Sequence, residues 1–152
     1  MKWNEEYSLG IEEIDSQHKE LLRLFSIVQD DLRTEQRWSS IHYSIVEIID
    51  FSQFHFGFEE ALMRLYGFPG YEEHRKVHGQ LLGKADELLG ESMKGGARDD
   101  IAKFFGDWLV EHMKRADRGY AQHILAGAKV VGSARAGQGH NSASVSSDRN
   151  MA

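Results

Sequence analysis

The sequence predicts an all-α protein, an antiparallel up-down-up-down four-helix bundle with an N-terminal loop and a disordered C-terminal tail. Apolar residues recur at alternating spacings of three and four through four long segments, which is the pattern of amphipathic helices. The chain has one proline, Pro69, and shows no strand-like alternation of apolar and polar residues. Because the segments are joined by short turns, neighbouring helices must run in opposite directions.

The four helices are expected at about residues 12–37, 39–66, 71–90 and 99–126. Ser39 and Ser40 are candidate caps for the second helix. The run from Gly67 to Gly70 contains the proline and ends the second helix, and residues 91–96 should form the loop before the fourth. The apolar faces are marked by residues such as Ile14, Leu21, Phe25, Ile41, Ile45, Leu81, Leu88, Ile101, Phe105 and Trp108.

The domain is expected to cover residues 1–126, and residues 127–152 to form a flexible tail rich in Gly and Ser. A segment of this composition buries too little apolar surface to offset the entropy lost on ordering. We therefore predict that the tail takes no part in the bundle.

Charge and cysteine content exclude several classes of protein. The 152 residues include 24 acidic and 18 basic ones, so the net charge of −6 does not favour binding to nucleic acid. The absence of cysteine excludes disulfides, iron-sulfur clusters and thiolate zinc sites, so that a bound metal would need nitrogen and oxygen ligands. The acidic N-terminus lacks the apolar run of a signal peptide, and no run of about 18 apolar residues suggests a membrane span. A cytoplasmic location is the resulting prediction.

Histidines and carboxylates interrupt the apolar faces. His55 and Glu59 are four residues apart, as are His74 and His78, so that each pair points from one face of its helix. His18 lies on the apolar face of the first helix. The fourth helix carries His112 and also Asp117, five residues later, a spacing that turns about 140° past a full turn. Asp117 can reach the same centre only through a locally widened turn or a sideways reach.

Each of these residues also has an ordinary structural interpretation. A single histidine such as His18 is often a hydrogen-bonded core residue, Asp117 could be a surface residue, and Glu60 could be the solvated neighbour of Glu59. Five histidines and two carboxylates at a similar depth have no such simple explanation, whereas a dinuclear metal site accounts for all of them. The remaining histidines are expected to face solvent: His42, His123 and His140.

The motifs together resemble those of the hemerythrin family over roughly residues 3–120. They are Gly10-Ile11, Asp15-Ser16-Gln17-His18, His55-x-x-x-Glu59-Glu60 with Met63, Tyr66-Gly67-Phe68-Pro69, His74-x-x-x-His78 and Trp108-Leu109-x-x-His112-x-x-x-x-Asp117. The resemblance implies that His74, His78 and His112 bind one iron and that His18 and His55 bind the other. It also implies that Glu59 and Asp117 bridge the two irons beside an oxo or hydroxo group.

By the same resemblance, dioxygen is the ligand, and it binds at the five-coordinate iron held by His18 and His55. Trp108 and Leu109 resemble the family residues that pack the oxygen pocket, although ordinary core packing would also explain them. Nitrogen and oxygen ligands do not by themselves distinguish iron from manganese or zinc.

The expected function is reversible oxygen binding for storage, delivery or sensing, in a non-enzymatic and monomeric protein. One alternative is an oxygen- or redox-responsive partner of a signalling protein. Another is a di-iron enzyme acting on peroxide or nitric oxide. Ferritin-like oxidases use the Glu-x-x-His spacing, which occurs nowhere in this chain. An oxygen-consuming enzyme or a signalling protein could be a protein partner, and neither nucleic acid nor membrane is expected as one.

Overall fold

The computed structural model describes residues 2–34, 37–92 and 98–138. Helices make up the secondary structure of this part, which contains no strand. They are η1 (Glu5–Tyr7), α1 (Glu12–Arg33), α2 (Trp38–Leu65), α3 (Tyr71–Ser92), α4 (Arg98–Glu111), the π-helical turn η2 (His112–Ala116) and α5 (Asp117–Gln138).

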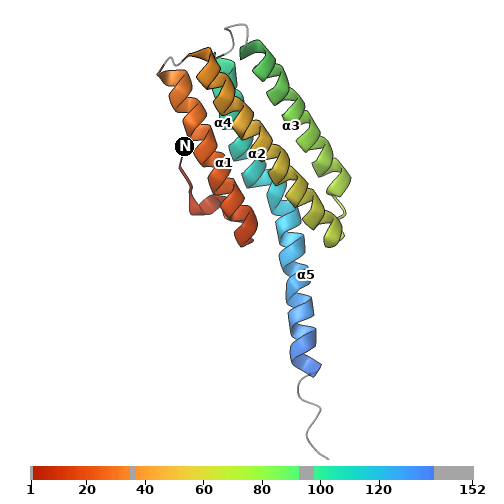
Figure 1. Ribbon diagram of the computed structural model, residues 1–152. Helices are drawn as coiled ribbons and strands as arrows, with labels where there is room; N and C mark the ends of the chain where they lie inside the picture. Colours follow the sequence, from red (N-terminus) through yellow and green to blue (C-terminus); the bar gives the residue numbers. More distant parts are fainter. Residues whose placement is uncertain (1, 35–36, 93–97, 139–152) are drawn as a thin grey trace, which may run out of the picture.

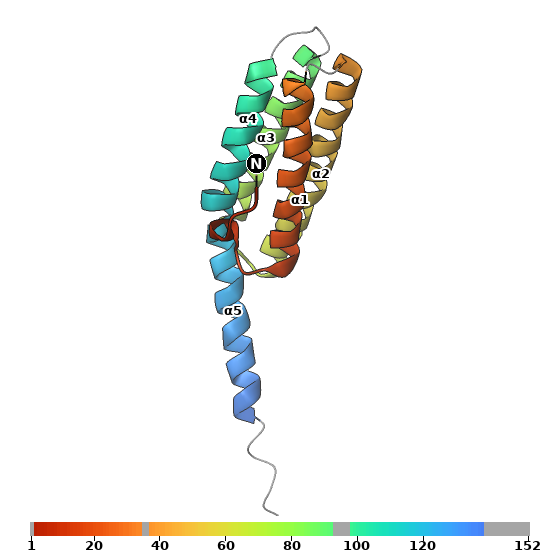
Figure 2. The same ribbon diagram turned by 90° about the vertical axis from the view of Figure 1, so that its left-hand side faces the viewer.

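The predicted four-helix bundle is confirmed. Figure 1 shows α1 to α4 side by side, with α5 continuing the line of α4 and projecting beyond the other helices. The view turned by 90° shows the same arrangement (Figure 2). The fourth long helix therefore consists of α4, η2 and α5 in succession, and all four long helices pass the level of the candidate site.

The side chain of Asp15 holds the N-terminal segment against α1 through hydrogen bonds. Its carboxylate accepts hydrogen bonds from the backbone N–H groups of Leu9, at 2.8 Å, and Gly10, and from the Ser8 hydroxyl at 2.6 Å. Gly10 adopts a φ of 78°, a left-handed conformation that glycine reaches without the penalty of a Cβ. These contacts turn the chain into the first helix and fix the level at which His18 enters the bundle.

Several helix ends differ from those expected. The first helix ends at Arg33, and the third continues to Ser92, while residues 93–97 lie outside the described part. The second helix begins at Trp38 with no side-chain cap, so Ser39 and Ser40 lie within its first turn and the prediction of a serine cap is wrong. Trp38 packs against the main core, and the Arg98 guanidinium lies 4.4 Å from its ring centroid, so tertiary packing rather than capping sets this end.

The apolar core has two parts with a polar layer between them. The larger cluster contains Phe25, Ile45 and Phe105, and the smaller contains Ile14, Met63 and Tyr120. Three long helices contribute to both clusters: α1, α2 and the helix made of α4, η2 and α5. In each of them, the predicted ligands lie close to the point where residues of one cluster give way to residues of the other. Apolar packing on both sides therefore encloses the polar layer.

Helix α5 continues past the expected end at Ala126 to Gln138, so residues 127–138 are helical and not the disordered segment that was expected. The last buried residue described is Ile124, and Ala126, Gly127 and Ala128 are exposed. Alanine, which recurs up to residue 136, favours a helix even without packing. Residues 139–152 of the expected tail lie outside the described part. None of the helices in the described ranges is long and apolar enough to cross a membrane.

Candidate metal centre

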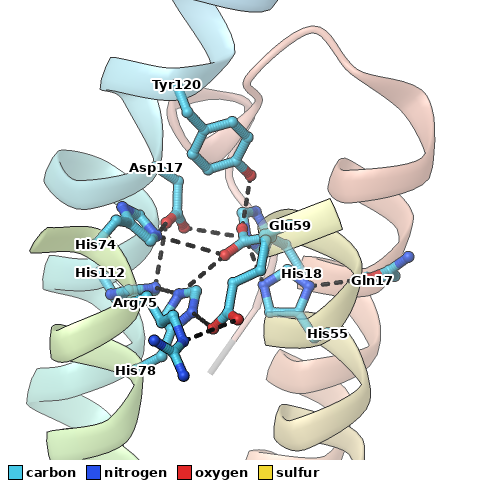
Figure 3. Close-up of polar contacts among 11 residues, drawn as sticks. Gln17, His18, His55, Glu59, His74, Arg75, His78, His112, Asp117 and Tyr120 are labelled. Atoms are coloured by element: carbon cyan, nitrogen blue, oxygen red, sulfur yellow. Dashed lines mark hydrogen bonds and ion pairs between the residues drawn. The ribbon is translucent and has the colours of Figure 1, made fainter. Parts of the chain in front are cut away.

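The structure brings all seven predicted ligand residues together in the polar layer of the bundle (Figure 3). They come from every long helix: His18 from α1, His55 and Glu59 from α2, His74 and His78 from α3, His112 from η2 and Asp117 from the start of α5. Each of the seven side chains is buried, the most exposed being His74 at 7%. No single helix could assemble this set.

The seven residues form two overlapping groups. Each group offers one ligand-type atom per residue, and within a group these atoms all lie within 4.8 Å of one another. One group contains three histidines and the other two, and Glu59 and Asp117 belong to both. The groups are His74, His78, His112, Glu59 and Asp117, and His18, His55, Glu59 and Asp117.

Glu59 presents one carboxylate oxygen to each group. Its Oε1 lies 3.3 Å from His55 Nε2 and 3.8 Å from His18 Nε2. Its Oε2 lies 3.1 Å from His78 Nε2 and 3.6 Å from His74 Nε2. The carboxylate thus lies between the two sets of imidazoles, as a ligand shared by two cations would.

Asp117 divides its two oxygens between the same groups. Its Oδ2 lies 3.3 Å from His18 Nε2, and its Oδ1 lies 3.3 Å from His74 Nε2 and 3.2 Å from His112 Nε2. Two buried carboxylates therefore divide their oxygens between the same two groups of imidazoles.

The π-helical turn explains how Asp117 reaches the site. Its backbone N–H bonds to the carbonyl of His112, five residues earlier, where an α-helix would use a spacing of four. The wider turn absorbs one extra residue, so that His112 and Asp117 face the same centre. Of the two possibilities left open by the sequence, the locally widened turn is confirmed.

Side chains outside the predicted set orient two of the imidazoles. Gln17 Oε1 accepts a hydrogen bond of 2.9 Å from His55 Nδ1, and Glu60 Oε1 accepts one of 3.0 Å from His78 Nδ1. A proton on Nδ1 leaves the lone pair of Nε2 free to face the centre. Glu60, at 20% side-chain exposure, is thus a partner of His78 rather than a plainly solvated neighbour of Glu59.

Tyr120 also contacts the candidate ligands, and sequence reasoning missed it. Its hydroxyl donates a hydrogen bond of 2.6 Å to Glu59 Oε1, and the side chain is fully buried. Burial and the negative charge of Glu59 raise the pKa of this phenol, so it remains a hydrogen-bond donor. The available signal was its position three residues after Asp117, which places both side chains on the same face of α5.

Most of the ligand-type atoms of the site lack a hydrogen-bond partner, as atoms that bind a cation would. Among the described side chains, the buried atoms without a hydrogen-bond partner include Nε2 of His18, His55 and His74, Oε2 of Glu59 and both oxygens of Asp117. The Nε2 atoms of His78 and His112 lie 3.2 Å apart. Unpaired buried polar atoms are costly, and metal ions would satisfy them.

Without a metal, protons take over part of this charge balance. Burial lowers the pKa of His18 and of His74, but the carboxylates of Asp117 and Glu59, 3.3–3.8 Å from each Nε2, outweigh burial and raise the pKa of each to about 9. Burial lowers the pKa of His112 to about 4. Although burial alone would raise the pKa of Glu59, the nearby charge of His55 and the close imidazole of His18 hold it well below its usual value. The metal-free site therefore binds protons that cations would displace.

Aromatic rings lie against the histidines of the site on the side of the larger cluster. The Phe56 ring stacks on the His78 ring at 3.9 Å, and the Trp108 ring centroid lies 6.3 Å from that of His112. Leu109 is 1% exposed and belongs to the same cluster. Two of the three histidines expected in solvent are described. His42 is half-buried, whereas His123 is exposed and donates from Nε2 to the Tyr66 carbonyl at 2.9 Å.

Comparison with known proteins places this arrangement in a family. Residues 9–124 match the family model described as the hemerythrin HHE cation-binding domain. The chain is 29% identical over 129 residues to bacteriohemerythrin of Methylococcus capsulatus, covering 83% of this chain and 98% of the relative. It is 29% identical over 118 residues to hemerythrin of Siphonosoma cumanense, covering 78% and 88%. A crystal structure of wild-type hemerythrin superposes with a TM-score of 0.75 at 27% identity, covering 82% of this chain and 97% of the other. This chain belongs to the hemerythrin family.

Proposed function

We propose that this protein holds two iron ions in its polar layer and binds dioxygen reversibly at one of them. The observation that carries the proposal is the division of the Glu59 and Asp117 oxygens between two groups of imidazoles. A single cation would leave one set of buried donors without a partner, whereas two cations satisfy both sets.

In this proposal, His74, His78 and His112 would hold one iron and His18 and His55 the other, with Glu59 and Asp117 shared between the two positions. The donor set of neutral imidazoles and carboxylates suits iron as well as other divalent metals. Membership of the hemerythrin family supports iron, and the hydrogen bonds to Gln17 and Glu60 support Nε2 of His55 and His78 as the binding atoms.

The two positions differ in the number of protein ligands. One group contains five residues and the other four, so the position beside His18 and His55 has one protein ligand fewer. A metal position must keep a site open to bind an added ligand, and this position is the one we assign to dioxygen. Two ferrous ions held by these residues would supply the two electrons that reversible binding of dioxygen requires.

The apolar side chains around the site help to keep the binding of dioxygen reversible. Phe56, Trp108 and Leu109 are nearly or fully buried and form a wall without charged groups. Water and protons that reach the site favour release of an oxidised product, and an apolar wall hinders both. We assign no catalytic residue, and we propose storage, delivery or sensing of oxygen as the use of this binding.

The proposal is tested by metal analysis and by visible spectroscopy of the reduced protein before and after exposure to air. We expect two irons per chain and an absorption band that appears in air and disappears under an inert gas. The variant His55→Ala should lose the band, while His123→Ala, at an exposed histidine, serves as the control. One iron per chain, or steady consumption of peroxide with a reductant in place of a reversible band, would overturn the proposal.

A further inference from the structure

We propose that a small apolar cavity between α2, α3 and α4 is a holding site for dioxygen next to the metal centre. The cavity has a volume of about 10 Å³. That volume is about the minimum for a single water, so the cavity has room for no more than one small molecule. The identity of the gas rests on the proposed function, but the existence of the site does not.

The cavity favours an apolar molecule over water. Its walls include Ile49, Leu82, Ala85 and Phe104, and the hydroxyl of Ser52, the polar side chain on α2, already donates to the Ile48 carbonyl at 2.6 Å. Among the described side chains that line it, Trp108 Nε1 is the buried polar atom left without a partner. A buried water needs two to four polar partners. This indole N–H and the lone pairs of the Ser52 oxygen offer at most two, the minimum, so the mainly apolar lining is a poor site for water.

On its inner side, the cavity is bounded by side chains that pack directly against the candidate metal ligands. Phe56 lines the cavity, stacks on the His78 ring at 3.9 Å and lies 5.8 Å from the His55 ring, so the same ring touches both groups of ligands. Trp108 also lines it and lies 5.9 Å from Phe56. A single aromatic layer thus separates a molecule in the cavity from the candidate ligands.

On its outer side, the cavity adjoins a groove at the surface between α3 and α4. The groove has a volume of about 490 Å³ and shares Phe104 and Trp108 with the cavity. These two rings stack nearly parallel, with centroids 6.1 Å apart and planes 10° apart. Phe104 is partly buried. The stacked pair therefore separates the cavity from the groove, and a gas molecule that enters the cavity from solvent must pass these two rings.

Methyl NMR of the oxidised iron-containing protein, compared under nitrogen and under dioxygen, tests the site without a variant. Dioxygen is paramagnetic, so it broadens the signals of methyl groups that it visits, while the effect of the iron is the same in both samples. We expect several-fold greater added relaxation at the methyl groups of Ile49 and Ala85 than at Ile14, which is also buried but does not line the cavity. Equal relaxation at the three residues would overturn the proposal.

Filling the cavity tests its connection to the metal centre. Ala85→Leu places three more carbons in it, and Ala102→Leu makes the same change at a partly buried position that does not line it. We expect Ala85→Leu to abolish the added relaxation at Ile49 and to slow dioxygen association several-fold, with neither effect in Ala102→Leu. Loss of the relaxation without slower association would overturn the role as a holding site. Absence of the oxygen-dependent band in the parent protein would instead refute the proposed function.

Discussion

Replacing Tyr120 with Phe removes one hydroxyl group and one hydrogen bond from the metal centre. The ring packs against Phe68 and His74 and can stay in place, so the substitution changes little except the 2.6 Å bond to Glu59 Oε1. In the metal-free protein, this leaves a fully buried carboxylate oxygen with one partner fewer. In the metal-loaded protein proposed above, the same oxygen also binds a cation, so the loss should be smaller.

The magnitude follows from the burial and charge of the acceptor. A hydrogen bond to a charged group contributes about 1.5–3 kcal/mol to the free energy of unfolding, and full burial of both partners favours the middle of that range or above. A loss of about 2 kcal/mol reduces the equilibrium constant for folding by about 30-fold. For a chain of this size, it lowers the melting temperature by roughly 4–8 °C.

The measurement is the free energy of unfolding of parent and variant, each with and without iron. Tyr71→Phe is the matched control, because Tyr71 packs against the same smaller cluster and its hydroxyl forms no hydrogen bond with the described residues. Two results would refute the stabilising role of the hydrogen bond from Tyr120 to Glu59. Tyr120→Phe would lose no more stability than Tyr71→Phe, or it would lose as much with iron as without it.

Four further predictions concern the same centre. Removing the iron should lower the melting temperature, because seven buried ligand groups lose their cations. Equal melting temperatures of the two forms would contradict the claim that these seven side chains bind the metal together. In the metal-free protein, the stability contributed by His18 and His74 is complete below pH 6.5 and is lost as pH rises through 9, because folding raises both pKa values from 6.5 to about 9. The expected loss in the free energy of unfolding is up to about 3 kcal/mol per histidine. Unfolding is measured from pH 6.5 to above 9, and the loss should be absent when iron is bound. The same pH dependence with and without iron would contradict the prediction. Leu109→Ala should retain two irons and cost about 3 kcal/mol of stability while shortening the lifetime of the oxygenated protein; equal lifetimes would leave Leu109 with core packing alone. Deleting residues 130–152 should leave iron content unchanged, because the last buried residue described is Ile124, and loss of iron would show that the boundary at 126 is misplaced.

The widened turn at η2 illustrates how the sequence can contain a difficulty that only the structure resolves. A spacing of five between His112 and Asp117 does not fit one face of an α-helix, and the sequence indicates this misfit. The π-helical hydrogen bond from Asp117 to His112 resolves it and also sets the direction from which Tyr120 meets Glu59. The turn lies at the functional centre, as is common for π-helical turns.

Contacts between helices were the part of the site that sequence reasoning could not supply. Gln17 meets His55 across 38 positions, and Tyr120 meets Glu59 across 61. Neither pair has a periodic signal, because the relative rotation and height of two helices depend on how all their side chains pack. The starting residue of α2 has the same cause, since the contact of Trp38 with Arg98 prevailed over a local serine cap.

The sequence by itself determined the four amphipathic helices, their antiparallel order and the seven ligand-type residues, because these depend on spacing within single helices. Only the tertiary structure decided which oxygen of Glu59 and Asp117 faces which histidines, which side chains support the imidazoles, and where the cavity beside Phe56 lies. These features depend on the register and separation of helices that are distant in the chain. The packing of the whole bundle sets both quantities, and no local pattern encodes them.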